Sequence, residues 1–250
     1  MDLPDLGPWP RTPTEAEAVQ DALRARLDLP GTARATAPDA ARTTSTGPET
    51  PGGALPARSD AAPATIAGLD VSYEPGSERL AAAVVVLDAE TLEVVAESVV
   101  EGRAAFPYIP GLLGFREVPA LLDALRALPL TPDVLVCDGY GLAHPRRFGL
   151  ACHVGVLTGL PTFGVAKTGF IGAHEPPGPE RGARAPLVHE GDEVGAALRT
   201  RTGVRPVFVS IGHRIDLDTA CALTLRLTPE YRLPETTRRA DRLSRDALVD

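Results

Sequence analysis

Residues 65–73 read TIAGLDVSY, an apolar run typical of a buried strand, with one carboxylate, Asp70, inside it. Residues 134–139 read VLVCDG, and there Asp138 closes a second apolar run. An unpaired carboxylate inside a sheet costs several kcal/mol even after relaxation, so each aspartate requires a partner. Two acids cannot neutralise each other, whereas one divalent cation can neutralise both. Because Mg²⁺ commonly links a few carboxylates to phosphate oxygens, the two runs predict a metal-dependent enzyme acting on phosphate esters.

The elements around these two runs indicate an α/β fold. The first strand, 64–73, is followed by two more with short connections, which predicts an antiparallel meander. A Gly/Pro-rich loop is expected over 169–185. The order β-β-β-α-β-α-β resembles a ribonuclease H-like mixed sheet flanked by helices, in which the first and fourth strands are parallel neighbours and would bring Asp70 and Asp138 together. The other expected elements are strands 80–87, 93–100, 133–137, 162–166 and 204–211, and helices 115–127, 147–157, 217–227 and 235–248.

The N-terminal part of the chain differs in composition from the rest. A capping box, Thr14 to Glu17, predicts a helix that continues to about Leu27 and packs on the core as part of a unit over 1–31. Residues 32–63 are rich in Ala, Pro, Thr and Gly and have almost no large apolar side chains. Such a segment cannot offset its ordering entropy, which predicts a disordered or loosely packed insertion before a main domain over 64–250.

The bulk composition narrows the class of protein. The chain has 250 residues, of which 44% are hydrophobic, and this suits one α/β domain with additions. A formal net charge of −8 argues against a protein that coats nucleic acid non-specifically, although a local basic groove remains compatible with it. The three cysteines lack CxxC spacing and are expected to be buried thiols. No apolar stretch approaches the length of a membrane span, so we expect a soluble, cytoplasmic protein that does not bind membranes.

Three further residues have chemistry that suits a phosphate-ester site at strand ends. Glu117 lies at the start of an expected helix, where it could be a third metal ligand or simply a favourable charge for the helix N-terminus. Lys167 follows the strand 162–166 and could reach a phosphate, or it could be a solvated surface lysine. His213 follows another strand and could be either a site residue or a hydrogen-bonded structural histidine.

The segment after Asp138 contains glycines and a basic turn. Gly139 and Gly141 allow a flat ligand to approach backbone donors, and they equally fit a tight turn. Arg146 and Arg147 could hold phosphates at the start of the following helix, or they could be a solvated basic turn.

Residues 106–111 read FPYIPG and form a stiff tip, because prolines restrict the backbone before folding. Tyr108 at this tip could enter a duplex and fill the gap left by an extruded base. The alternative is a core tyrosine on a proline-rich turn.

Five segments together resemble the endonuclease V family, the deoxyinosine 3′ endonucleases, in family order. The resemblance runs from about Ala64 to Asp241 and is fainter over the N-terminal helix. The segments are 67–73 (AGLDVSY), 107–117 (PYIPGLLGFRE), 138–150 (DGYGLAHPRRFGL), 164–167 (GVAK) and 210–215 (SIGHRI).

The resemblance implies a ribonuclease H-like nuclease of DNA repair that uses Mg²⁺, with Mn²⁺ as a substitute. It implies hydrolysis of the second phosphodiester bond 3′ to deoxyinosine, which leaves 3′-hydroxyl and 5′-phosphate ends. It implies DNA with deaminated bases as the partner, with inosine-containing RNA as an alternative, and a monomer is expected. It assigns the metal to Asp70, Glu117 and Asp138, catalytic roles also to Lys167 and His213, the wedge to Tyr108, and the base pocket to Gly111, Leu113, Gly139, His144 and Leu150.

The sequence departs from the family pattern at two places. Many members have histidine where this chain has Tyr140, and the family lacks so long a segment between the first helix and the first strand as 32–63. Two rival functions therefore stay open: another ribonuclease H-like nuclease, cutting RNA or other nucleic-acid structures, and a nucleic-acid-binding module that does not cut. Three acids together with Lys167 disfavour the second rival, because binding does not require them.

Overall fold

The computed structural model describes residues 1, 3, 6–30 and 62–249. The insertion expected over 32–63 lies almost entirely outside the described residues. The strands are β1 (Thr65–Tyr73), β2 (Arg79–Asp88), β3 (Val94–Arg103), β4 (Val134–Asp138), β5 (Thr162–Ala166), β6 (Arg184–His189), β7 (Asp192–Leu198) and β8 (Val207–His213). The helices are α1 (Pro13–Arg24), α2 (Leu113–Ala127), α3 (Leu150–Thr158), α4 (Leu217–Arg226) and α5 (Glu235–Asp246).

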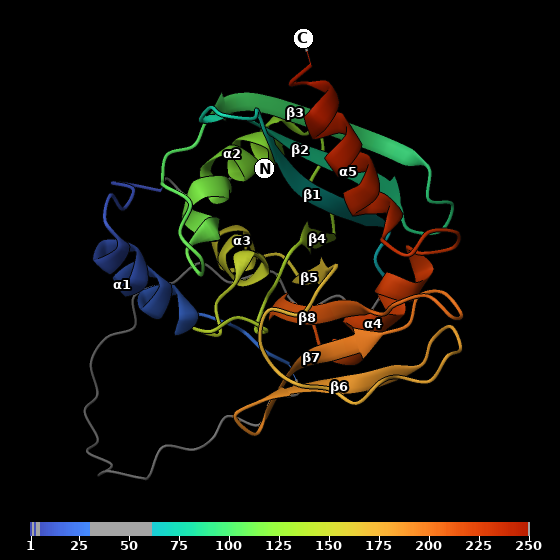
Figure 1. The fold of residues 1–250 in the computed structure, drawn as a ribbon. Helices are drawn as coiled ribbons and strands as arrows, with labels where there is room; N and C mark the ends of the chain where they lie inside the picture. Colours follow the sequence, from blue (N-terminus) through green and yellow to red (C-terminus); the bar gives the residue numbers. More distant parts are fainter. Residues whose placement is uncertain (2, 4–5, 31–61, 250) are drawn as a thin grey trace, which may run out of the picture.

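One sheet organises the fold, in the order β3-β2-β1-β4-β5-β8-β7-β6 (Figure 1). The pairs β1–β4 and β4–β5 are parallel, and the other pairs are antiparallel. Helices α2 and α3 lie on one side of the sheet, and α5 crosses β1 and β2 on the other. The expected mixed ribonuclease H-like sheet is confirmed, including the parallel neighbours β1 and β4.

The sequence did not predict the hairpin of β6 and β7. Residues at its turn, Glu190 and Gly191, both have positive φ, as a two-residue hairpin turn requires. Pro186 lies within β6, where it is tolerated because β6 is an edge strand of the sheet. The loop expected over 169–185 therefore ends where this hairpin begins.

Three helix starts differ from the expected ones. Helix α1 is capped by Thr12, whose side chain accepts a hydrogen bond from the backbone of Glu15, so the capping box lies two residues earlier than expected. Pro13 selects this start because it has no N–H to satisfy and suits the first helical position. Helix α2 begins at Leu113, which places Glu117 one turn inside the helix instead of at its opening. Helix α3 begins at Leu150 rather than Arg147.

Two local features fix the helices that border the site. Pro119 inside α2 has no N–H for the carbonyl of Phe115, and the indole Nε1 of Trp9 donates to that carbonyl at 2.8 Å. Gly68 in β1 lets α5 pack closely, since a Cβ there would lie 2.2 Å from the backbone carbonyl carbon of Thr236. The N-terminal segment is thus attached to α2, and α5 is held against β1.

Other expectations can be read directly from the described residues. Cys137, Cys152 and Cys221 are free, buried thiols, as expected. Burial raises the pKa of Cys152 to about 12. Among the described residues, no helix has the length and apolarity needed to cross a membrane.

Candidate active site

The two aspartates that interrupt the apolar runs lie side by side. The parallel register of β1 and β4 ends with Leu69 opposite Cys137, so Asp70 and Asp138 are the next residues on neighbouring strands. Asp138 also pairs with Val165 of β5, and Lys167 follows β5 at the same end of the sheet. The sheet itself therefore brings two acids and a cation together, although 68 positions separate the two aspartates along the chain.

The environment of two acids disfavours their charged forms. Burial, followed by the charges of Asp138 and Asp241, raises the pKa of Asp70 to about 7. Glu117 is 7% exposed, and burial together with the charge of Asp70 raises its pKa to about 8. Crowded carboxylates of this kind are found at functional sites more often than at structural ones, because each destabilises its neighbour's charge.

Each acid accepts a hydrogen bond from a donor of its own. Lys167 Nζ donates to Asp138 Oδ2 at 2.9 Å. Ser244 Oγ, on α5, donates to Asp70 Oδ2 at 3.2 Å. Tyr73 Oη donates to Glu117 Oε1 at 3.2 Å, and the guanidinium of Arg116 lies 4.7 Å from the centre of the Tyr73 ring. These donors fix the orientation of the carboxylates from three different elements.

The sequence contains one lysine, Lys167. Apart from the histidines, all its other basic side chains are arginines. Partial burial acts to lower its pKa, but the hydrogen bond and charge of Asp138, together with Asp241 and Asp70, raise it overall. An ammonium group is a compact charge, whereas a guanidinium is planar and broad. The single lysine therefore stands where a compact permanent charge faces the acids.

Helix α5 adds an acid that the sequence analysis missed. Asp241 lines the same cavity of about 560 Å³ as Asp70, Asp138 and Lys167, and it contributes to the raised pKa of Asp70. Arg245, one turn later, binds Asp241 with Nη2 2.6 Å from Oδ1. The small buried residues of α5 mark the face on which Asp241 lies, but nothing in the sequence shows that this face packs on β1.

The donor set fits a hard divalent cation, because it consists of carboxylate oxygens at one end of the sheet. Asp70 and Glu117 are also the groups whose charge a bound cation would stabilise. Within the described ranges, however, no three Asp, Glu, His or Cys side chains form a closed cage. The hydrogen bonds from Lys167, Ser244 and Tyr73 orient the acids. Glu117 approaches from α2, whereas Asp241 belongs to α5, on the other side of the sheet.

A second cavity of about 440 Å³ adjoins the acids. Asp138 and Lys167 line both cavities. Tyr108 lies at the second cavity with 68% of its surface exposed, which excludes the alternative of a core tyrosine. The structure places all five residues expected of a base pocket in this wall: Gly111, Leu113, Gly139, His144 and Leu150. We call the cavity of about 560 Å³ the acid cavity, and we call this second one the base cavity after the pocket that the sequence resemblance implies.

Polar and aromatic groups give the base cavity its character. Burial lowers the pKa of His144 to about 4, so its imidazole is neutral at pH 7; its Nδ1 accepts a hydrogen bond from the backbone N–H of Arg146 at 3.2 Å, so Nε2 carries the proton. Phe170, which the sequence analysis missed, lies 5.2 Å from the Tyr140 ring and 5.6 Å from the His144 ring, measured between ring centres. Tyr140 donates from its hydroxyl to the Thr168 carbonyl, so it braces the loop that presents Phe170.

His213 is not part of this site. It pairs with Thr162 at the start of β5, whereas Lys167 follows the end of that strand. Its Nδ1 accepts a hydrogen bond from the backbone N–H of Asp28 at 3.2 Å, and the side chain is 6% exposed. Because β8 runs antiparallel to β5, the C-terminal end of β8 and the C-terminal end of β5 lie at opposite ends of the sheet. The structure therefore supports the hydrogen-bonded structural histidine.

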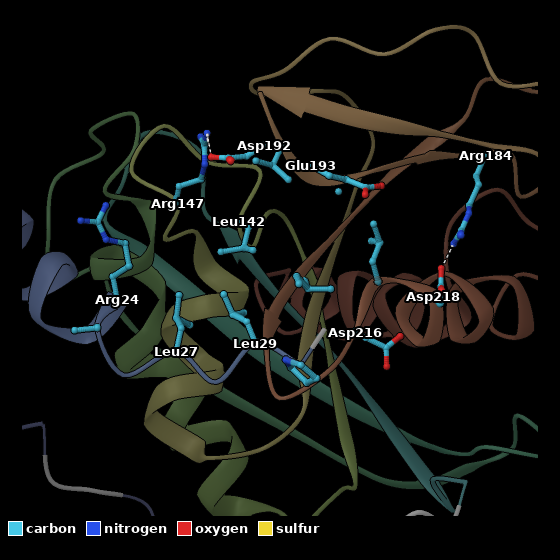
Figure 2. A pocket seen from close by; sticks show the side chains of 16 residues that line it. Arg24, Leu27, Leu29, Leu142, Arg147, Arg184, Asp192, Glu193, Asp216 and Asp218 are labelled. Carbon is cyan, nitrogen blue, oxygen red and sulfur yellow. Dashed lines mark ion pairs between the residues drawn. The ribbon is translucent and has the colours of Figure 1, made fainter. Parts of the chain in front are cut away.

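The two arginines expected to bind phosphate also face away from the acids. Arg146 binds Asp21 of α1 with Nη2 2.7 Å from Oδ2. Arg147 lies on a third cavity of about 930 Å³, where it forms an ion pair with Asp192 (Figure 2). Figure 2 also shows the ion pair between Arg184 and Asp218 in the same cavity. Both candidate phosphate ligands are thus engaged with acidic side chains of the chain itself.

The ribonuclease H-like sheet, in which the neighbouring strands β1 and β4 bring Asp70 and Asp138 together, places this chain in the class of ribonuclease H-like nucleases. The family model for endonuclease V matches residues 55–242. An endonuclease V from Streptomyces avermitilis is 56% identical over 248 residues, which cover 97% of this chain and 95% of that protein. The chain therefore belongs to the endonuclease V family.

Solved structures agree with this assignment. A crystal structure of endonuclease V from Streptomyces avermitilis has a TM-score of 0.82 and 54% identity, covering 96% of this chain and 95% of that one. Endonuclease V from Ciona intestinalis, solved with a 24mer DNA containing an inosine followed by a ribo-adenosine, has a TM-score of 0.73 and 26% identity, covering 94% of this chain and 97% of that one.

Proposed function

We propose that this protein is a Mg²⁺-dependent endonuclease that recognises deoxyinosine in DNA. It hydrolyses the second phosphodiester bond 3′ to the lesion, so that water adds to phosphorus, the bond to the 3′ oxygen breaks, and 3′-hydroxyl and 5′-phosphate ends remain. The observation that supports this best is the wall of Asp138 and Lys167, which separates the acid cavity from the base cavity. The family and the inosine-containing DNA of the Ciona protein support the choice of substrate.

Asp70, Glu117 and Asp138 would hold the cation, with Asp241 as a fourth carboxylate beside them. Mg²⁺, or Mn²⁺ in its place, would supply neutralisation of the phosphate charge and a lower pKa for the attacking water. Ser244 and Tyr73 keep two of these carboxylates in a fixed orientation. Lys167 would stabilise the negative charge that grows on the phosphate, because its ammonium lies at the wall shared by both cavities.

Tyr108 and the base cavity would select the lesion before cleavage. An exposed tyrosine on a proline-braced tip can occupy the space of an extruded nucleotide, and unpairing is cheapest for a mismatched base. His144 offers a neutral polar group inside an otherwise mainly apolar and backbone-lined cavity. We also propose that the protein acts as a monomer.

The decisive experiment compares oligonucleotides with inosine in DNA, inosine in RNA and no inosine, each with Mg²⁺, Mn²⁺ or Ca²⁺. We expect cleavage of the inosine DNA at the second bond 3′ to the lesion, and none of the undamaged duplex. RNA is included because the DNA bound by the Ciona protein has a ribonucleotide after its inosine. Stronger cleavage of RNA would reassign the main substrate, and an intact inosine strand under every metal and pH would refute the proposal.

Tyr108→Ala tests the wedge. Because one aromatic stacking contact contributes about 1–3 kcal/mol, we expect roughly tenfold weaker binding of inosine DNA, with cleavage at saturating protein nearly retained. Binding is measured in Ca²⁺, and single-turnover cleavage in Mg²⁺. Tyr231→Ala is the matched control, since Tyr231 is 41% exposed and contacts Arg238 instead of lining a cavity. Equal affinity for Tyr108→Ala and wild type would make the tip structural.

A further inference from the structure

Helix α1 lies outside residues 55–242, the segment matched by the family model, yet one of its side chains lines the base cavity. Gln20 is 3% exposed. A buried amide requires compensation for its lost hydration, so the contacts of this side chain indicate why glutamine stands there.

The amide group of Gln20 joins two loops that are distant in the sequence. Its Nε2 donates to the carbonyl of Gly111 at 2.9 Å and to the carbonyl of Phe148 at 3.2 Å. Gly111 belongs to the proline-braced tip that presents Tyr108, and Phe148 belongs to the loop between Asp138 and α3. Since both residues line the base cavity, a single side chain connects two of its walls.

The other half of the amide indicates that Gln20 was not selected for stability. Its Oε1 is buried and has no hydrogen-bond partner among the described residues. An unpaired buried acceptor destabilises the folded protein, whereas an apolar side chain of similar volume, such as methionine, would avoid that cost. A residue that breaks this local rule at the wall of a site points to a role in the site and not in the fold.

Helix α1 has other attachments that do not involve Gln20. Arg24 donates from Nη1 to the Arg146 carbonyl at 3.1 Å, and Asp21 binds the Arg146 side chain. Leu23, one turn after Gln20, packs into the core and does not line the base cavity. The helix can therefore stay in place when Gln20 is changed, and the effect of the amide can be separated from that of helix packing.

We propose that Gln20 is a positioning residue of the base cavity, which fixes the spacing of the Gly111 and Phe148 walls and thereby the selectivity for the flipped base. This inference rests on the proposed function. Without the two N–H···O bonds the two loops would move independently, so the cavity would fit the lesion base less closely. The acids would be unaffected, because neither Gln20 nor its two carbonyl partners belongs to the acid cavity.

Gln20→Met removes both amide donors with little change of volume. We expect the KM for an inosine duplex to rise about tenfold, with kcat within about threefold of wild type. The preference for inosine over undamaged duplex, measured by binding in Ca²⁺, should fall by about the same factor. A residue that acted only through folding would lower the active fraction and leave KM and this preference unchanged.

Leu23→Ala is the control for helix packing, and it should lower the melting temperature without changing the preference. Hydrogen exchange of residues 106–112 and 141–149 gives a readout that needs no substrate, and we expect faster exchange in both loops of Gln20→Met but not of Leu23→Ala. If wild type shows no preference for inosine, the proposed function fails. If wild type shows it and Gln20→Met keeps both the preference and slow exchange, or if Leu23→Ala loses the preference equally, the positioning role is refuted.

Discussion

The two ends of the central sheet both contain a cavity with charged side chains, but the charges are arranged in opposite ways. At one end Asp70, Asp138 and Asp241 are like charges gathered around Lys167. At the other end arginines and acids are paired, and Arg147 lies 3.6 Å from Asp192 in the third cavity. Charges that are paired with opposite charges stabilise a surface, whereas crowded like charges lower the stability of the protein and are found mainly at functional sites. The comparison therefore separates the working end from the structural end without reference to any relative.

The largest difference between the two ends should appear when one carboxylate is neutralised at each. For Asp138→Asn we expect cleavage of the inosine strand to fall by at least about 1,000-fold, because this residue borders both cavities and is a candidate metal ligand. Asp192→Asn, in the cavity at the other end, should cleave at the wild-type rate. Binding of the inosine strand in Ca²⁺ should persist in both variants. Equal loss in both would remove the distinction between the ends.

Replacing Lys167 with arginine should give the next largest loss of cleavage. Lys167→Arg keeps the charge but replaces a compact ammonium with a broad, planar group, so we expect cleavage to fall by about 10- to 100-fold. Single-turnover rates at saturating Mg²⁺ measure this loss. An active Lys167→Arg variant would mean that charge by itself suffices and that the presence of the single lysine has no catalytic reason.

The pH dependence of stability should also distinguish the ends. Asp70 has a pKa raised from 3.8 to about 7, so the unfolded chain loses its proton near pH 4 while the folded protein keeps it until about pH 7. The free energy of unfolding therefore falls as the pH rises between these values, and Asp70 contributes a loss of about a few kcal/mol in total. Urea unfolding in EDTA should show Asp70→Asn gaining stability over wild type across this range.

Comparison with the variant is needed because other groups act in the opposite direction. Burial lowers the pKa of His213 to about 4 and that of His153 to about 3. Below about pH 6.5 these histidines take up protons in the unfolded chain first, so they make the folded protein less stable as the pH falls. They are present in both proteins and cancel in the difference. A difference between wild type and Asp70→Asn that stays constant from pH 4 to pH 7 would contradict the raised pKa.

The smallest effect on cleavage is expected for His213→Gln. This change weakens the hydrogen bond from the Asp28 backbone at the structural end, which should cost about 1 kcal/mol of stability. Cleavage at saturating Mg²⁺ should stay within about twofold of wild type. A large loss of cleavage with unchanged folding would return His213 to the catalytic residues and show that the two ends are coupled.

The sequence predicted the layout of the strands up to β5 because apolar runs and short connections determine it locally. Asp138 and Lys167 could be placed together because they stand at the ends of neighbouring strands, and Asp70 could be added because it lies in β1 beside the end of β4. The sequence shows that His213 follows a strand, but it does not show whether that strand is parallel or antiparallel to its neighbour. Because β8 runs antiparallel to β5, His213 lies at the end of the sheet away from Lys167.

Other misses have similar causes. Asp241 and Gln20 act through contacts between elements more than 90 residues apart in sequence, which no local pattern encodes. The β6–β7 hairpin was missed because Pro186 and the glycines suggest a loop unless the strand is known to be at an edge. Arg146 and Arg147 looked free for phosphate because their acidic partners belong to α1 and the β6–β7 hairpin.

The strand that carries Asp138 borders both the acid cavity and the base cavity. β4 pairs with β1 as far as Cys137 and with β5 as far as Asp138, so the sheet fixes the wall that the two cavities share, whereas the loops that contain Gly111 and Phe148 form other walls of the base cavity. If the protein cuts as we propose, the shared wall keeps the same place whichever base enters the base cavity, and the number of nucleotides between that base and the cut should not depend on the base.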